Sequence, residues 1–172
     1  NLINDTPLNF AFLELFSQAS ANSGGDFDKL FVPYRCMVAD VVGHKAIAVK
    51  SGNLADAIRG TCAVPFVYRP VKVNGRYVFD GGIYNNFPVD VLKSDFNPDY
   101  IIGSNVSSNT FNTYPKDEEK LVSQFLLYMF LANTDSTHLG GSGAYIHPDI
   151  GEYTPVNFTN VAELIKKGYE AT

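Results

Sequence analysis

Apolar and polar positions recur with two periods along this chain, and these periods predict helices and strands in turn. A first helix is expected from Thr6-Pro7, because threonine can cap a helix and proline suits its first position. Apolar residues then recur at helical spacing until two glycines end the pattern: Phe10, Leu13, Phe16, Gly24 and Gly25. A second helix is expected after the capping residue Asn53, and Pro65 ends its pattern.

Apolar runs predict strands at Tyr34–Ala39 and Lys45–Lys50, joined by a turn at 41–44. A hairpin is expected at Val71–Phe79, because Asn74-Gly75 separates two alternating runs and suits a two-residue turn. The pattern of Asp99–Val106 predicts a buried strand of the parallel type, at the centre of the sheet.

The rest of the chain predicts a helix at Asp117–Ala132, a flexible loop at Gly140–Gly143 and a last helix after Asn160. Glu163 stands three residues after Asn160, in capping-box register. Strands thus alternate with helices, which favours an α/β layer fold. No repeat or internal boundary is visible, and 172 residues suffice for one domain with a sizeable core.

Composition and charge exclude some classes of function. The chain is 45% hydrophobic and 18% charged, as is usual for a globular domain. Its net charge of −5 and its lack of a Lys/Arg cluster argue against nucleic-acid binding. The longest apolar run, Phe125–Ala132, is far shorter than the roughly 20 residues that span a bilayer. Cys36 and Cys62 favour buried free thiols, although a disulfide stays open, and the isolated histidines offer no metal site.

The segment after the predicted hairpin combines a carboxylate with two glycines, Asp80-Gly81-Gly82, and continues through Ile83–Val89. An apolar strand thus delivers one Asp onto a turn in which glycine tolerates positive φ and leaves room for a backbone or a ligand. Such an Asp could face a pocket and contact a second reactive group, or it could simply form the turn.

The run Asp80–Val89 resembles the Asp-Gly-Gly motif of patatin-like phospholipases. Upstream, Pro33–Asp40 resembles the central strand of that family, and Asn53–Pro65 resembles its helix of the type Ala-hydrophobic-Arg-Ala-Ser-x-x-hydrophobic-Pro. Val71–Phe79, the segment Ile146–Asp149 and the closing segment Asn157–Tyr169 also fit, so the resemblance covers nearly the whole chain in the right order. It implies an α/β fold, the patatin-like three-layer arrangement with a mostly parallel central sheet.

The family also carries a glycine-rich oxyanion loop and a Gly-x-Ser-x-Gly nucleophile elbow ahead of these segments, and this sequence has neither. The nearest strings, Gly140–Ala144 and Ile102–Asn105, lack glycines on both sides of the serine at the required spacing, and they follow Asp80. Residues 1–172 are therefore expected to be the C-terminal portion of one patatin-like domain, and a missing N-terminal segment would bear the serine.

The resemblance implies ester hydrolysis by a Ser–Asp dyad that needs no metal or organic cofactor. Asp80 would be the base partner, and Gly81, Gly82 and Asn86 would support the active-site turn. The substrate would be a lipid or another acyl ester, with peripheral membrane contact, and the bacterial cytoplasm and the cell envelope both stay open as compartments. The alternative is a catalytically inactive lipid-binding or interaction module.

Further polar residues are expected to be structural: Asp40, Arg59, Arg69, Ser104, Ser107 and His147. The two arginines could meet a phosphate headgroup, but surface roles explain them better. The apolar stretch Leu121–Leu131 has two interpretations, a core helix or a wall that contacts acyl chains or a membrane.

Overall fold

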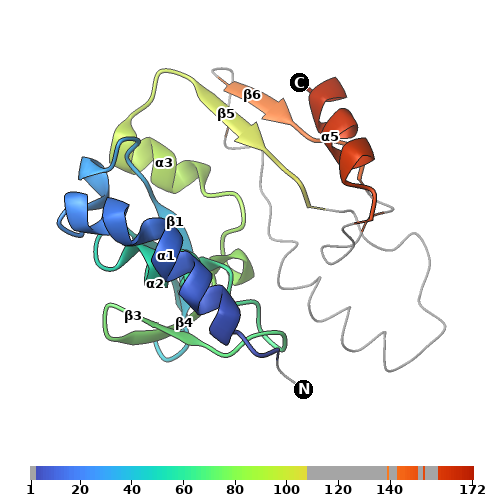
Figure 1. The fold of residues 1–172 in the computed structure, drawn as a ribbon. Helices are drawn as coiled ribbons and strands as arrows, with labels where there is room; N and C mark the ends of the chain where they lie inside the picture. The colour runs from blue at the N-terminus through green and yellow to red at the C-terminus, as the bar shows by residue number, and fades with distance from the viewer. Residues whose placement is uncertain (1–2, 108–138, 140–142, 151–152, 154–158) are drawn as a thin grey trace. The chain divides into compact units, whose positions relative to one another are not determined.

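The computed structural model describes residues 3–107, 139, 143–150, 153 and 159–172. The chain divides into two compact units, Asn1–Asn86 and Phe87–Thr172. Both contain helices and strands (Figure 1), so the predicted α/β class is confirmed. The predicted helix at 117–132, its apolar stretch and most of the predicted loop at 140–143 lie outside the described residues.

A four-stranded sheet forms the first unit, in the order β2 (Lys45–Val49), β1 (Cys36–Asp40), β4 (Arg76–Asp80) and β3 (Val71–Val73). Every neighbouring pair in it is antiparallel. Short turns join β1 to β2 and β3 to β4, and a connection that short can only reverse the chain direction. The mostly parallel sheet that the resemblance implies is therefore not confirmed in this unit.

The turn between β3 and β4 confirms the hairpin signal. Asn74 and Gly75 have φ angles of 47° and 81°, and a tight two-residue turn needs positive φ at both positions. The register pairs Val73 with Arg76 and Val71 with Val78. The hairpin thereby aligns β4 so that Asp80 falls at its last position.

Two helices accompany the sheet of the first unit. Helix α2 (Leu54–Thr61) packs on the sheet, and α1 (Thr6–Asn22) packs on α2. Asn53 caps α2 as predicted, since its Oδ1 accepts the Asp56 N–H at 3.2 Å. The predicted Thr6 cap is wrong: Asp5 occupies the N-cap position of α1 and makes no side-chain cap bond, so Thr6 already lies inside the helix.

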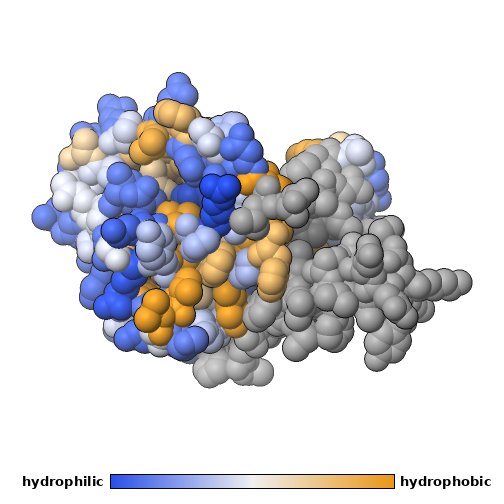
Figure 2. All heavy atoms as spheres, turned by 90° about the horizontal axis from the view of Figure 1, so that it is seen from below, coloured by the Kyte–Doolittle hydropathy of each residue, from blue (hydrophilic) through white to orange (hydrophobic). Residues whose placement is uncertain are grey.

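The core of the first unit gathers side chains from the sheet, from α2 and from the short helix η1 (Phe27–Lys29): Phe27, Cys36, Val38, Val49, Leu54, Ala57, Val73 and Val78. Of the apolar residues predicted along α1, Phe16 packs against this cluster, but Phe10 is 68% exposed. Seen from below, apolar residues reach the surface of the described part between hydrophilic ones (Figure 2). The first unit therefore carries exposed apolar surface as well as a buried core.

The second unit contains α3 (Val89–Phe96), β5 (Ile101–Ser104), β6 (Gly143–Ile146) and α5 (Val161–Glu170). β5 and β6 pair in parallel. The strand predicted at Asp99–Val106 is of the parallel type as expected, but it is only partly buried, because Ile101 is buried whereas Ile102 is 68% exposed, and among the described residues it pairs with β6 alone. Asn160 precedes α5, but its side chain makes no cap hydrogen bond. No helix in the described ranges is both long and apolar enough to cross a membrane.

Candidate active site

Asp80 is the last residue of β4 and lies beside two other segments of the first unit. It pairs with Val38 of β1, and its backbone N–H donates to the carbonyl oxygen of Ala63 at 2.9 Å. Ala63 follows α2 by two residues. Strand β1, strand β4 and the chain after α2 therefore meet at this one aspartate.

The carboxylate of Asp80 is partly buried, and its Oδ1 accepts the N–H of Gly82 at 2.9 Å. Burial raises the pKa of Asp80 above the ordinary value for an aspartate, and the hydrogen bond from Gly82 opposes this rise only in part. A carboxylate with a raised pKa holds a proton more readily. Asp80 is thus a stronger base than an exposed aspartate.

The two glycines after Asp80 provide space rather than unusual backbone angles. Neither Gly81 nor Gly82 has a positive φ, so the turn does not use the tolerance of glycine for that conformation. A Cβ at Gly81 would overlap the carbonyl group of Met37, and a Cβ at Gly82 would lie 2.8 Å from Oδ1 of Asn86. At Gly81, only glycine lets the turn pack this closely against β1.

The side chain of Asn86 lies against the turn, beside Gly82. The turn itself begins with η2 (Gly81–Ile83), and the N–H groups of Tyr84 and Asn85 both donate to the carbonyl oxygen of Gly81. The structure therefore brings together all four residues that the sequence analysis selected: Asp80, Gly81, Gly82 and Asn86.

Cys62 also lies near the Asp80 carboxylate. Partial desolvation of the thiol, and then the negative charge of Asp80, raise the pKa of Cys62. The prediction of two buried thiols is wrong for Cys62, which is exposed, and right for Cys36, which is buried. Both cysteines are free, and burial raises the pKa of Cys36 to about 11.

Asp40 shows a contrasting environment at the end of β1. Its Oδ1 accepts the N–H groups of Val42 and Gly43, and its Oδ2 pairs with Arg76 at 2.8 Å. The hydrogen bond from Gly43 and the Arg76 guanidinium lower the pKa of Asp40, although burial opposes them. As the sequence predicted, Asp40 holds a neighbouring turn.

Three other polar candidates of the sequence, Ser104, Ser107 and His147, belong to the second unit. Nδ1 of His147 lies 2.9 Å from the carbonyl oxygen of Asn105, and the His147 ring stacks on Tyr145. The N–H of Ser107 donates to Oδ1 of Asn105. The contact between His147 and Asn105 connects the ends of β5 and β6 and gives His147 a structural role in that unit.

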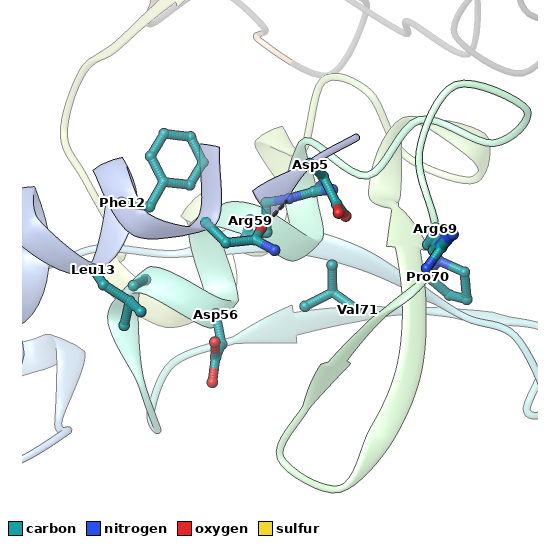
Figure 3. Close-up of a pocket in the computed structure, with 10 residues that line it drawn as sticks. Asp5, Phe12, Leu13, Asp56, Arg59, Arg69, Pro70 and Val71 are labelled. Carbon is teal, nitrogen blue, oxygen red and sulfur yellow. Dashed lines mark hydrogen bonds and ion pairs between the residues drawn. The ribbon is translucent and has the colours of Figure 1, made fainter. Parts of the chain in front are cut away.

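A pocket of about 280 Å³ lies between α1, α2 and the start of β3 (Figure 3). Arg59 lines it and is buried, so the expected surface role of this arginine is wrong. Its guanidinium donates to Asp5 at 2.7 Å and to Asn9 at 2.8 Å, and it lies over the ring of Tyr68. The sequence could not show this, because Asp5 is 54 positions away. Asp80 does not line this pocket.

Comparison with known proteins matches one segment of the chain to a protein family. Residues 28–93 match the family of patatin-like phospholipases. A Mycobacterium tuberculosis protein named "Uncharacterized NTE family protein" is 36% identical over 62 residues, which is 36% of this chain and 17% of that protein. A second M. tuberculosis protein of the same designation is 23% identical over 155 residues, 76% of this chain and 26% of that protein.

A protein of Invertebrate iridescent virus 6 named "Probable lipid hydrolase" is 27% identical over 71 residues, which is 38% of this chain and 23% of that protein. The matches thus span only 17% to 26% of the length of these relatives. The resemblance to patatin-like phospholipases that the sequence predicted is therefore confirmed for residues 28–93, the segment that contains Asp80 and its turn.

Proposed function

We propose that this chain supplies the carboxylate base of a lipid acyl hydrolase that uses a Ser–Asp dyad. The supporting observation is the position of Asp80, a partly buried carboxylate with a raised pKa on a glycine turn. The family of residues 28–93 and the name of the viral relative both point to lipid hydrolysis. On this proposal, residues 1–172 are the C-terminal portion of one patatin-like domain with three layers and a mostly parallel sheet.

In the proposed reaction, a serine from a segment outside this sequence donates a hydrogen bond to Asp80. Asp80 takes the hydroxyl proton as the serine oxygen attacks the ester carbonyl, which forms a tetrahedral oxyanion. The oxyanion collapses, the alcohol leaves with the proton from Asp80, and an acyl-serine remains. Water then attacks the acyl-serine by the same steps and releases the carboxylic acid.

The environment of Asp80 suits this role. An exposed aspartate, with a pKa near 4, is a poor base for an alcohol, and partial burial strengthens it. Gly82 holds the carboxylate in place through Oδ1. Gly81, Gly82 and Asn86 pack closely together, which keeps the turn compact beside Asp80. The reaction needs no metal ion or organic cofactor.

The test compares this chain, a longer protein that includes the upstream segment, and variants of the longer protein, with a chromogenic acyl ester. We expect hydrolysis by the longer protein only. Asp80→Asn should lower kcat by a factor of roughly 10³ or more, a scale taken from single deletions in another serine hydrolase. Asp40→Asn is the matched control, because Asp40 also ends a strand of this sheet but holds a turn. It should lower stability and leave the kcat of the folded protein unchanged.

Hydrolysis by this chain alone, or full activity of Asp80→Asn, would show that the nucleophile or the base lies elsewhere. The upstream coding sequence gives a second check. A glycine-rich loop followed by Gly-x-Ser-x-Gly supports the hydrolase, whereas their absence favours a lipid-binding module that lacks catalysis.

A further inference from the structure

The chain after α2 makes a four-residue β-turn, Val64–Val67, with an unusual residue at its third position. The N–H of Val67 donates to the carbonyl oxygen of Val64 at 3.3 Å, which closes the turn Val64-Pro65-Phe66-Val67. Phe66 has a φ of 67°. Proline at the second position and positive φ at the third are the features of a type II turn, in which glycine or asparagine is the favoured third residue.

Phe66 is the bulkiest of the non-glycine residues with positive φ in the described part of the chain, which are His44, Phe66, Asn74 and Asn97. Asparagine tolerates this conformation well and histidine is also enriched there, but a bulky aromatic residue in it is strained. Phe66 is also 62% exposed, so burial in the core does not account for the choice of phenylalanine over glycine. Strain of this kind clusters at sites that contact ligands.

The turn begins immediately beside Asp80. Ala63 precedes it and accepts the backbone N–H of Asp80 at 2.9 Å. The charge of Asp80 also contributes to the raised pKa of the Cys62 thiol, after burial, so the carboxylate lies within electrostatic reach of this segment. Tyr84, four residues after Asp80, is 44% exposed. Two exposed aromatic residues thus come from the two segments that meet at Asp80.

We propose that Phe66 is a specificity-determining residue that contacts the acyl chain of the ester beside Asp80 and so favours long chains. This inference rests on the hydrolase function proposed above. A phenyl ring offers neither charge nor a hydrogen bond, so it fits the apolar part of such a substrate and not its headgroup. Glycine at this position would give a less strained turn without that contact.

The test measures kcat/KM of the longer protein with para-nitrophenyl laurate and para-nitrophenyl butyrate. Phe66→Gly should lower the laurate-to-butyrate ratio by about tenfold, the loss expected when about two methylene groups lose an apolar contact. Phe66→Leu should keep most of the ratio, because leucine retains apolar surface. Phe66→Gly should also melt at or above the temperature of the unchanged protein, because glycine relieves the strain.

His44→Gly is the matched control. His44 also has a positive φ, 49°, but it lies in the turn after Asp40, and β4 runs away from that turn as it approaches Asp80. This substitution should raise the melting temperature and leave the ratio unchanged. An unchanged ratio in Phe66→Gly, or an equal loss in His44→Gly, would overturn the role of Phe66.

Asp80→Asn separates this inference from the proposed function. If it abolishes hydrolysis of both esters while Phe66→Gly keeps the ratio, only the inference about Phe66 fails. If it leaves butyrate hydrolysis intact, the assignment of Asp80 is wrong and the inference falls with it.

Discussion

Replacing Gly81 with alanine should destabilise the first unit much more than the same change at Gly82. At Gly81 a Cβ would overlap the carbonyl carbon and oxygen of Met37 and lie 2.5 Å from its Cβ. These atoms belong to the buried strand β1, which is paired on both sides and cannot move alone. Overpacking of this kind costs about 1–3 kcal/mol, and we expect about 3 kcal/mol here.

At Gly82 the nearest atoms to a new Cβ are Oδ1 of Asn86 at 2.8 Å and Oδ1 of Asp80 at 3.2 Å. Both are ends of side chains and can rotate away. Alanine also reduces the entropy of the unfolded chain, which stabilises by about 0.4–1 kcal/mol. The net loss at Gly82 should therefore be about 1 kcal/mol or less.

Urea denaturation followed by circular dichroism measures both losses. With an m-value of about 2 kcal/mol/M, a difference of about 2 kcal/mol separates the two midpoints by about 1 M. The m-value itself should not change, since neither variant alters the surface exposed on unfolding. Equal midpoints for the two variants, or a loss below about 0.5 kcal/mol at Gly81, would refute the argument that Met37 requires this glycine.

Two further predictions concern charge around Asp80. Iodoacetamide should modify the exposed Cys62 well before the buried Cys36. Asp80→Asn should speed the reaction at Cys62, because removing the negative charge lowers the pKa of that thiol. A reaction rate at Cys62 that the substitution does not change would contradict this. The raised pKa of Asp80 means that the folded state binds its proton more tightly than the unfolded state does, so its contribution to stability is lost as pH rises through the folded pKa. Asp80→Asn should thus raise the melting temperature at pH 7, and this gain should shrink toward about pH 4, near the pKa of an unfolded aspartate. A gain in melting temperature that grows on acidification would show that the pKa of Asp80 is lowered and not raised.

The features that the sequence predicted well depend on neighbouring residues. Asn74-Gly75 specifies its turn through its own backbone preferences, and the turn then sets the register that brings Asp80 to the end of β4. Asn53 caps α2 through a hydrogen bond that spans only three residues. The four-residue cluster around Asp80 was predictable for the same reason, because Asp80 to Asn86 is one continuous turn.

The features that the sequence missed depend on distant residues. Arg59 is buried where its guanidinium donates to Asp5, the residue before α1, and to Asn9 of α1, and no local pattern links these positions. Cys62 is exposed at the C-cap of α2, although the next residue, Ala63, is buried, and the apolar pattern does not distinguish the two positions. No local signal marks Phe66, because phenylalanine normally indicates packing in a hydrophobic core. Only the structure shows that this residue occupies a turn position suited to glycine.

Asp40 and Asp80 end neighbouring strands of one sheet, yet their surroundings favour opposite protonation states. Two backbone N–H groups and Arg76 stabilise the charge of Asp40, whereas Asp80 receives one N–H and lies beside no cation that pairs with it among the described residues. Environments that shift two carboxyl groups in opposite directions separate a structural acid from a reactive one. If Asp80 had only a structural role, hydrogen bonds and a cation as complete as those of Asp40 would make the folded state more stable. The uncompensated carboxylate, a Gly81 that admits no side chain and the strained Phe66 instead occur around one strand end, and this concentration of unfavourable terms supports the proposal that the end of β4 is the reactive part of the first unit.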